Sequence, residues 1–232
     1  MKTKVFNKTF RFHKLQIKKI MQLDEIKQFG KENNVPISLD DTLSFLLSTM
    51  VSNNCKQILE IGTAIGYSSI AMATNTNCEH IDTIEIDAER YSLAVENIKS
   101  ANLTQKITPY LIDAMDYLKN CTKKYDFIYL DGAKNQYINY LPYLVKILNP
   151  NGIIMADNLY FHGMVLGKVK VTTGCRAMIK SLHKYIAEIT TNPIFDTLIY
   201  DIGDGVGLTR IKQANMGEFP KPNKKIEKIK KN

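Results

Sequence analysis

The chain has 232 residues, of which 44% are hydrophobic and 23% charged, a composition typical of one globular domain with a buried core. No apolar run reaches the length of a membrane span, and the basic N-terminus lacks the apolar segment of a secretory signal. We therefore expect a cytoplasmic protein with no membrane attachment. No cysteine lies in a Cys-x-x-Cys pair or near a histidine at metal spacing, which favours free thiols. The cysteines are Cys55, Cys78, Cys121 and Cys175.

The formal charge of +8 is concentrated at the two ends of the chain. Residues 1–31 contain nine Lys and Arg against two Asp and Glu, and residues 212–232 contain seven Lys against two Glu. The residues between them are therefore mildly acidic. Two explanations stay open for the basic ends. They bind a polyanion, most simply RNA, or they are solvated tails that keep the protein soluble.

Near-helical spacing of apolar residues predicts an amphipathic helix over residues 14–30. Its apolar face is expected either to form the interface of a homodimer or to pack on its own domain. Pro36 interrupts the chain after this helix. Asp40 or Asp41 is then positioned to cap a second helix, predicted over residues 41–52.

Strands and helices alternate along the middle of the chain. The predicted strands are 57–61, 81–86, 107–111, 126–130 and 152–156. The predicted helices between them are 66–75, 88–101, 114–119 and 136–148. Asn149-Pro150-Asn151-Gly152 is expected to form a sharp turn into the fifth strand. This alternation predicts a mostly parallel sheet with helices on both faces.

The pattern changes near the C-terminus. A predicted loop (159–173) and helix (175–189) precede two strand-like runs, 195–202 and 206–211, which Gly203-Asp204-Gly205 joins as in an antiparallel hairpin. A parallel sheet finished by such a hairpin is the methyltransferase variant of the doubly wound α/β fold. We predict a Rossmann-like, seven-stranded, mostly parallel sheet with an antiparallel C-terminal hairpin.

The predicted organisation has three parts. Residues 1–31 form a basic N-terminal helical extension, residues 32–212 form the methyltransferase domain, and residues 213–232 form a basic C-terminal tail.

The segment Ile58–Ser68 contains an apolar strand followed by two glycines four residues apart. Glycine at Gly62 lets the backbone approach a ligand closely. The next strand ends near Glu85, 23 residues after Gly62, where an acid usually holds a pair of ribose hydroxyls. The chain is thus expected to bind a nucleoside-containing cofactor. An NAD-dependent or other nucleotide-binding protein stays open here as an alternative, and it would need none of the acids described next.

Two later strands also end in acids. Asp131 follows the fourth predicted strand, Asp157-Asn158 follows the fifth, and Lys134 comes three residues after Asp131. Because ligands bind beyond the carboxyl ends of parallel strands, we expect these side chains to meet. Two carboxylates and an amide oxygen suit Mg²⁺ or another hard divalent cation. The alternative is that the acids serve as loop or cap residues and Lys134 as a surface lysine.

In this order, the segments resemble the cation-dependent class I S-adenosylmethionine O-methyltransferases, the group that includes catechol and caffeoyl-CoA O-methyltransferases. The resemblance covers about residues 30–212, and the Gly203-Asp204-Gly205 turn also fits. The matching segments are Glu60–Ser68, Glu85, Asp113-Ala114, Asp131-Gly132-Ala133-Lys134 and Asp157-Asn158.

The resemblance implies S-adenosylmethionine and Mg²⁺ as cofactors. The cofactor-binding residues it implies are Ser38, Glu60, Gly62, Thr63, Gly66, Ser68, Glu85, Asp113, Ala114 and Asp131. Ser68 would donate a hydrogen bond to the cofactor's carboxylate, and Glu85 would accept both ribose hydroxyls. The metal ligands it implies are Asp131, Asp157 and Asn158. Lys134 and Asp131 are the implied catalytic residues, with Lys134 as the general base.

A chelated cation requires an acceptor with two neighbouring oxygens. Catechols have them, and so does 5-hydroxyuridine, whose hydroxyl lies beside a carbonyl. Bacterial members of the family that resemble this chain include tRNA 5-hydroxyuridine methyltransferases acting at the wobble position. Because the basic ends suit RNA and an unstacked loop base enters a pocket at low cost, we expect the tRNA anticodon loop as substrate and 5-methoxyuridine as product. The alternative is a small-molecule catechol or caffeoyl-CoA-type O-methyltransferase.

The segment after the predicted metal ligands offers aromatic and basic side chains for such an RNA. Stacking and phosphate contacts are expected from Tyr160, Phe161, His162, Lys168, Lys170 and Arg176. The competing interpretation is a loop that packs onto its own sheet.

Overall fold

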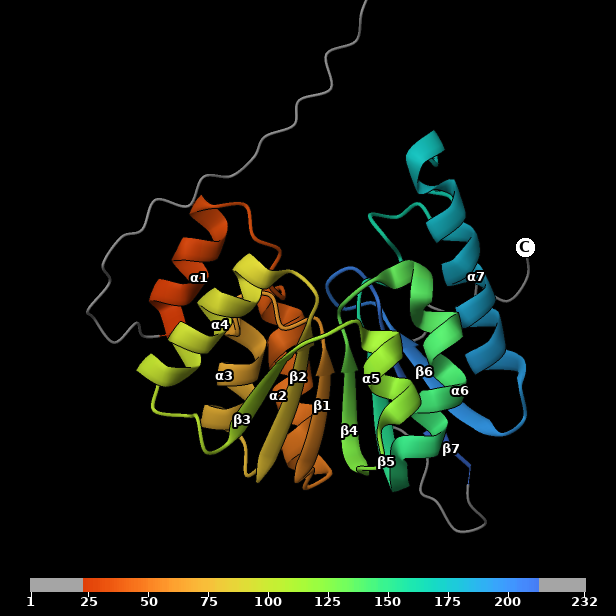
Figure 1. The fold of residues 1–232 in the computed structure, drawn as a ribbon. Helices are drawn as coiled ribbons and strands as arrows, with labels where there is room; N and C mark the ends of the chain where they lie inside the picture. Colours follow the sequence, from red (N-terminus) through yellow and green to blue (C-terminus); the bar gives the residue numbers. More distant parts are fainter. Residues whose placement is uncertain (1–22, 213–232) are drawn as a thin grey trace, which may run out of the picture.

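The computed structural model describes residues 23–212, so the predictions made for residues 1–22 and 213–232 lie outside the described residues. A seven-stranded sheet forms the middle layer, with helices on both faces (Figure 1). Its strands are β1 (Gln57–Ile61), β2 (His80–Glu85), β3 (Ile107–Leu111), β4 (Tyr125–Leu130), β5 (Leu148–Ala156), β6 (Phe195–Tyr200) and β7 (Val206–Ile211).

The strand order is β3-β2-β1-β4-β5-β7-β6. Strands β1 to β5 pair in parallel, whereas β7 pairs antiparallel with both β5 and β6. The predicted mostly parallel sheet with an antiparallel C-terminal hairpin is therefore confirmed. The chain leaves the centre through β2 and β3 and returns through β4, so the strand order reverses between β1 and β4. Ligands bind at the carboxyl ends of the strands at such a reversal.

Seven α-helices cover the sheet within residues 23–212. They are α1 (Leu23–Glu32), α2 (Asp40–Ser52), α3 (Tyr67–Asn75), α4 (Ala88–Ser100), α5 (Ala114–Asn120), α6 (Tyr137–Ile147) and α7 (Arg176–Thr191). Helices α1 to α4 share one hydrophobic core with one face of the sheet, and α5 to α7 share a second core with the other. Neighbouring strand residues face opposite cores, because side chains alternate along a strand: Ile128 packs with α6 and α7, and Tyr129 with α2 and α3.

Helix α1 is the described part of the helix predicted over residues 14–30. Its Ile26 is fully buried in the core that α2 and α3 share. The predicted domain boundary between residues 31 and 32 therefore falls inside a helix that packs on the domain. The predicted homodimer stays a prediction.

Neither Asp40 nor Asp41 caps α2, contrary to the expectation. The residue before the helix is Leu39, whose extended backbone carries no side-chain cap. Asp40 lies one position further on, in the first turn, and forms an ion pair of 2.5 Å with Lys27 of α1. Asp40 thus links α1 and α2 through an ion pair and does not cap α2.

The turn expected at Asn149–Gly152 lies inside strand β5 as an irregularity of the ladder. Tyr125 of β4 pairs with Leu148 and Phe127 pairs with Ile153, so extra residues of β5 bulge between these two pairs. All four cysteines are free. No helix in residues 23–212 is long and apolar enough to cross a membrane.

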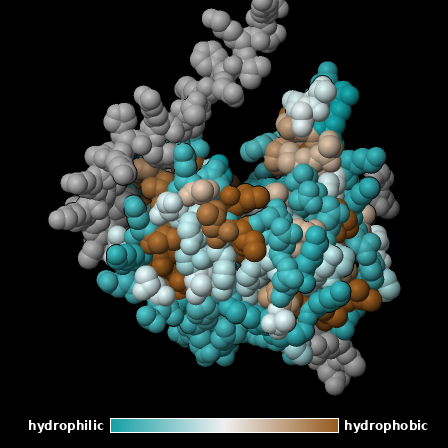
Figure 2. All heavy atoms as spheres, in the orientation of Figure 1, coloured by the Kyte–Doolittle hydropathy of each residue, from teal (hydrophilic) through white to brown (hydrophobic). Residues whose placement is uncertain are grey.

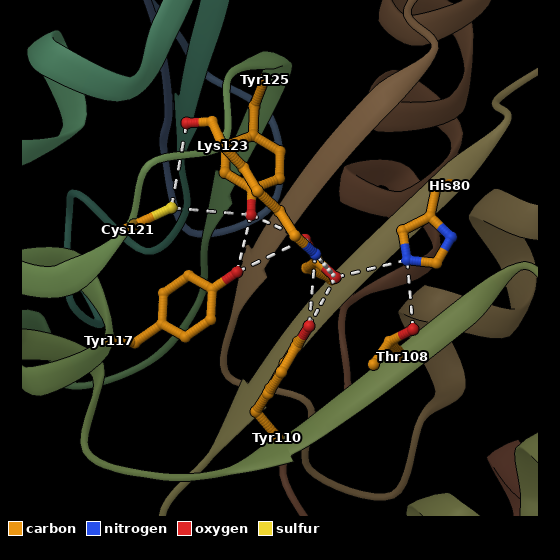
Figure 3. A network of polar contacts seen from close by, with 8 residues as sticks. His80, Thr108, Tyr110, Tyr117, Cys121, Lys123 and Tyr125 are labelled. Atoms are coloured by element: carbon orange, nitrogen blue, oxygen red, sulfur yellow. Dashed lines mark hydrogen bonds and ion pairs between the residues drawn. The ribbon is translucent and has the colours of Figure 1, made fainter.

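A buried carboxylate on β2, Asp82, ties the strand to the loop before β4 (Figure 3). Its oxygens accept hydrogen bonds from the Lys123 ammonium at 2.9 and 2.7 Å and from the Tyr125 hydroxyl at 2.7 Å. Further polar contacts come from Tyr110, Tyr117 and His80. Burial raises the pKa of Asp82, but the Lys123 and Tyr125 hydrogen bonds outweigh it and hold the pKa below its usual range.

We expect Lys123→Met to destabilise the fold by about 1–3 kcal/mol at pH 7, because it leaves a buried carboxylate without its cation. A carboxyl whose pKa is lowered by folding stabilises the fold above its unfolded pKa of about 4, and that stabilisation is lost as the pH falls through the folded value. In the variant the folded pKa rises, so acid unfolding should begin at a higher pH. Urea and acid unfolding curves measure both effects.

The control is Lys119→Met, since Lys119 is half exposed and lies 3.9 Å from the exposed Asp116. It should leave both curves close to those of the parent chain. Equal losses of stability in the two variants would show that the contact between Lys123 and Asp82 stabilises the fold no more than the exposed pair does.

Candidate active site

A cavity of about 710 Å³ opens beyond the carboxyl ends of β1, β2, β4 and β5, where the strand order reverses. All of the predicted site residues except Glu60 and Gly66 line it. The predicted residues in its wall are Ser38, Gly62, Thr63, Ser68, Glu85, Asp113, Ala114, Asp131, Lys134, Asp157 and Asn158.

The turn at Gly62 lines the cavity, and it also packs against the backbone that follows β4. Gly62 has a φ of +110°, and a Cβ there would lie 2.7 Å from the backbone oxygen of Asp131 and 2.9 Å from the nitrogen of Gly132. A side chain is therefore excluded by the backbone that follows β4, a reason additional to ligand approach. Gly66 lies outside the lining, immediately before α3, and packs against Ala94 of α4.

Glu60 is fully buried beneath this turn and does not line the cavity. Its carboxyl accepts hydrogen bonds from the hydroxyls of Ser68, Ser69 and Thr83. Burial raises the pKa of Glu60 to about 7 against the opposing effect of these hydroxyls. Glu60 thus anchors the first turn of α3 to β1. The Ser68 hydroxyl, expected to bind the cofactor's carboxylate, donates to Glu60 in this structure.

Glu85 connects the end of β2 to the glycine turn. One carboxylate oxygen accepts the N–H of Ala64 at 2.8 Å, and the other accepts the N–H groups of Ile86 and Asp87 at 2.9 and 3.0 Å. Three backbone donors fix its orientation in the cavity wall, and the oxygen that accepts only the N–H of Ala64 retains a lone pair for a ribose hydroxyl. Asp113 has a different task, because its carboxylate accepts the N–H groups at the start of α5.

The cavity that Glu85 and Asp113 line also has apolar side chains in its wall, and these are not among the predicted site residues. Ile86 and Ile112 line the cavity and expose 67% and 36% of their surface. Figure 2, drawn in the orientation of Figure 1, shows a group of apolar side chains near the middle of the surface in view, which is otherwise mostly hydrophilic. Exposed apolar walls next to Glu85 suit the flat base of a nucleoside. Isolated isoleucines after a strand look like ordinary core residues, so no sequence signal marks them.

The second cluster lies at the ends of β4 and β5. Asp131 and Asp157 both reach the hydroxyl of buried Tyr129, at 3.4 and 3.2 Å, and the Lys134 ammonium donates to Asp131 at 2.9 Å. Burial first, and then the negative charge of Asp131, raise the pKa of Asp157. Asn158 lines the cavity next to Asp157.

These residues fit a hard divalent cation. Two carboxylates that repel each other inside a cavity, with an amide beside them, supply the oxygen ligands that Mg²⁺ prefers while leaving positions for water or substrate. Residues 23–212 contain no cluster of three or more His, Cys, Asp or Glu that would form a metal site by itself. A cation held by Asp131 and Asp157 would therefore need a further oxygen ligand, and the amide of Asn158 could supply it.

The loop after β5 forms the remaining wall of the cavity. Phe161 and His162 line it, whereas Tyr160, which we expected to stack on a base, is buried against Gly205. The C-terminal hairpin supports this loop, since the Asp204 carboxylate accepts the N–H of His162 at 2.9 Å. The residues predicted to contact phosphates are not among the described residues that line the cavity. They are Lys168, Lys170 and Arg176.

Known proteins resemble this chain in sequence and in fold. The sequence model of the O-methyltransferase family matches residues 13–212. Tapetum-specific methyltransferase 1 of Arabidopsis thaliana is 31% identical over 192 residues, which are 80% of this chain and 82% of the relative. A caffeoyl-CoA O-methyltransferase of Citrus natsudaidai is 28% identical, over 73% of this chain and 77% of the relative. The solved structure of Podospora anserina methyltransferase PaMTH1 with bound S-adenosylhomocysteine superposes with a TM-score of 0.75 at 25% identity, covering 82% and 88% of the two chains.

The chain belongs to the O-methyltransferase family, and it is an S-adenosylmethionine-dependent enzyme. This assignment replaces the alternative of an NAD-dependent protein. It also agrees with the antiparallel hairpin, which a dehydrogenase fold would not require.

Glu85→Gln tests the cofactor half of the cavity. The amide keeps the shape but cannot accept on both atoms, so we expect S-adenosylhomocysteine to bind on the order of 10-fold more weakly. Isothermal titration calorimetry measures this affinity. The matched control is Glu79→Gln, whose side chain contacts Gln57 near the opposite end of β2. Unchanged affinity in Glu85→Gln would remove Glu85 from the cofactor site.

Proposed function

We propose that the enzyme methylates a hydroxyl of a small aromatic acceptor that carries a second oxygen beside it, and that it requires a divalent cation. One observation carries the proposal: Asp131 and Asp157, which share the hydroxyl of buried Tyr129 as a hydrogen-bond partner, line the same cavity as Glu85 and Gly62. The names of the relatives support the acceptor class, since one acts on caffeoyl-CoA and another is a flavonoid 3′,5′-methyltransferase of Vitis vinifera.

Bound S-adenosylmethionine supplies an activated methyl group, and a bound cation lowers the pKa of the acceptor hydroxyl and orients its two oxygens. Asp131, Asp157 and Asn158 would hold that cation. Asp131 holds Lys134 in the cavity wall at 2.9 Å. After the ammonium has released a proton to solvent, the neutral amine of Lys134 would take up the hydroxyl proton as the oxygen attacks. The oxygen–methyl bond forms as the methyl–sulfur bond breaks, and sulfur keeps the electron pair. Glu85 and the Gly62 turn would hold the cofactor in the cavity that Lys134 and Asp131 also line.

Asp157→Asn should reduce cation-dependent kcat/KM on the order of 100-fold or more, because it removes a charged ligand of the cation. The same change removes a buried carboxylate that Asp131 repels, so the melting temperature should stay equal or rise. Methyl transfer with and without EDTA, together with thermal unfolding, measures both. Asp116→Asn, at an exposed position of α5, is the control. Full EDTA-sensitive activity in Asp157→Asn would refute the metal assignment.

A second candidate acceptor is the wobble 5-hydroxyuridine of tRNA. The charge distribution favours it: residues 158–187 contain five Lys and Arg and no Asp or Glu, and Phe161 and His162 of this stretch line the cavity. The basic ends of the chain add to this charge. Such a surface suits the phosphates of an RNA strand.

Labelled S-adenosylmethionine distinguishes the two acceptors. Each reaction contains Mg²⁺ or EDTA, with either caffeic acid as a simple catechol or tRNA carrying 5-hydroxyuridine. We expect EDTA-sensitive labelling of the catechol and weaker labelling of the tRNA. Labelling of the tRNA alone, falling steeply with added salt, would favour the RNA substrate instead. Labelling that EDTA does not affect would refute the metal-dependent mechanism for either acceptor.

A further inference from the structure

Tyr129 is a buried residue of β4 that the proposed mechanism does not use. Its side chain is fully buried, and its hydroxyl lies within hydrogen-bond reach of three side-chain oxygens. The distances are 3.1 Å to Ser38 Oγ, 3.2 Å to Asp157 Oδ2 and 3.4 Å to Asp131 Oδ2. A hydroxyl this deep in the sheet would ordinarily need one partner, and this one has three.

The two carboxylates divide their oxygens in the same way. Oδ1 of Asp131 accepts from Lys134 at 2.9 Å, and Oδ1 of Asp157 accepts from the backbone N–H of Asn158 at 2.6 Å. Each acid is thus fixed to its own turn through Oδ1. The two Oδ2 atoms, which come from different strands, meet at the hydroxyl of Tyr129.

Hydroxyl chemistry limits what Tyr129 can do with these partners. A tyrosine hydroxyl has one proton to donate and lone pairs to accept, so it donates to one carboxylate at a time while the Ser38 hydroxyl donates to it. Ser38 belongs to the segment between α1 and α2, which also lines the cavity. The hydroxyl therefore links three separate parts of the wall.

We propose that Tyr129 is a positioning residue that sets the rotation and separation of Asp131 and Asp157 for a divalent cation, and that it couples this pair to the Ser38 segment. The inference rests on the proposed function, because it takes the two acids as ligands of the cation. Hydrogen-bonded neighbours of metal ligands typically change metal affinity about 10- to 100-fold when they are removed. Tyr129 touches no reacting atom in this assignment.

The test is the affinity for Mn²⁺, measured by electron paramagnetic resonance on the full chain without acceptor or cofactor. Tyr129→Phe keeps the ring and removes the hydroxyl, and we expect Mn²⁺ to bind roughly 10- to 100-fold more weakly. The matched control is Tyr137→Phe. Tyr137 is equally buried and loses one hydrogen bond of 2.8 Å, to the backbone oxygen of Leu130, and within residues 23–212 its hydroxyl forms no hydrogen bond to either carboxylate. Its Mn²⁺ affinity should match that of the parent chain.

Ser38→Ala tests the link to the N-terminal segment in a double-mutant cycle. Alone it should weaken Mn²⁺ binding, because the Tyr129 hydroxyl loses the donor that orients it. In the Tyr129→Phe background it should have no further effect, since Ser38 reaches the acids only through that hydroxyl. If Tyr129→Phe does not fold, Ser38→Ala alone decides, and an unchanged Mn²⁺ affinity overturns the proposal.

The outcomes separate this inference from the proposed function. A parent chain that binds no Mn²⁺ overturns both. A parent chain that binds Mn²⁺, with Tyr129→Phe within twofold of it, overturns the role of Tyr129 and leaves the metal site in place. Equal losses in Tyr129→Phe and Tyr137→Phe also overturn it, because they reflect general loosening of the core.

Discussion

Direct backbone contact between the turn after β1 and the turn after β4 positions both halves of the active site. Gly62 leaves no space for a side chain against Asp131 and Gly132, and the N–H of Asp131 donates to the oxygen of Ile61 at 2.9 Å. The same ladder continues outward, from Asp157 to Leu130 and from Gly62 to Ile84. Because these bonds fix where each strand ends, Glu85 at the end of β2 is held at the same edge of the sheet as Asp131 and Asp157, which follow β4 and β5.

Three buried carboxyl groups, those of Asp82, Glu60 and Asp157, have different hydrogen-bond and charge partners, and their pKa values shift differently. Asp82 has a lysine and a tyrosine hydroxyl, which keep it ionised and make it a stabilising tie. Glu60 has only hydroxyl partners, and burial raises its pKa to about 7. Asp157 has a second carboxylate as its neighbour, and both its burial and that neighbour disfavour the charged form. Asp157 is the one of these three carboxyl groups that has a second carboxylate beside it, and a cation bound in the cavity would offset that repulsion.

Much of this could be predicted from the sequence because the information is local. Alternating strands and helices, the glycine turn and the acids at strand ends specify the sheet and most of the cavity wall. What could not be predicted depends on contacts between distant segments. The sequence predicts Asp40 or Asp41 as a helix cap, because the pairing of Asp40 with Lys27 is invisible along the chain. Glu60 resembles a ligand-binding acid in sequence, and only its three hydroxyl partners show that it is internal. Tyr129 follows the strand pattern of a core residue, so its polar end carries no signal.

One part of the cavity wall is formed by two separate segments of the chain, the loop after β5 and the turn between β6 and β7. Residues 158–162 follow β5, and they are supported by the hairpin turn at Gly203–Gly205 through Asp204 and through the N–H of Leu159, which donates to the oxygen of Gly205 at 2.9 Å. Neither piece contributes to the Gly62 turn or to Glu85. An acceptor bound against this wall would contact segments that are separate from the Gly62 turn and Glu85. Their side chains could therefore be exchanged without altering either of those features.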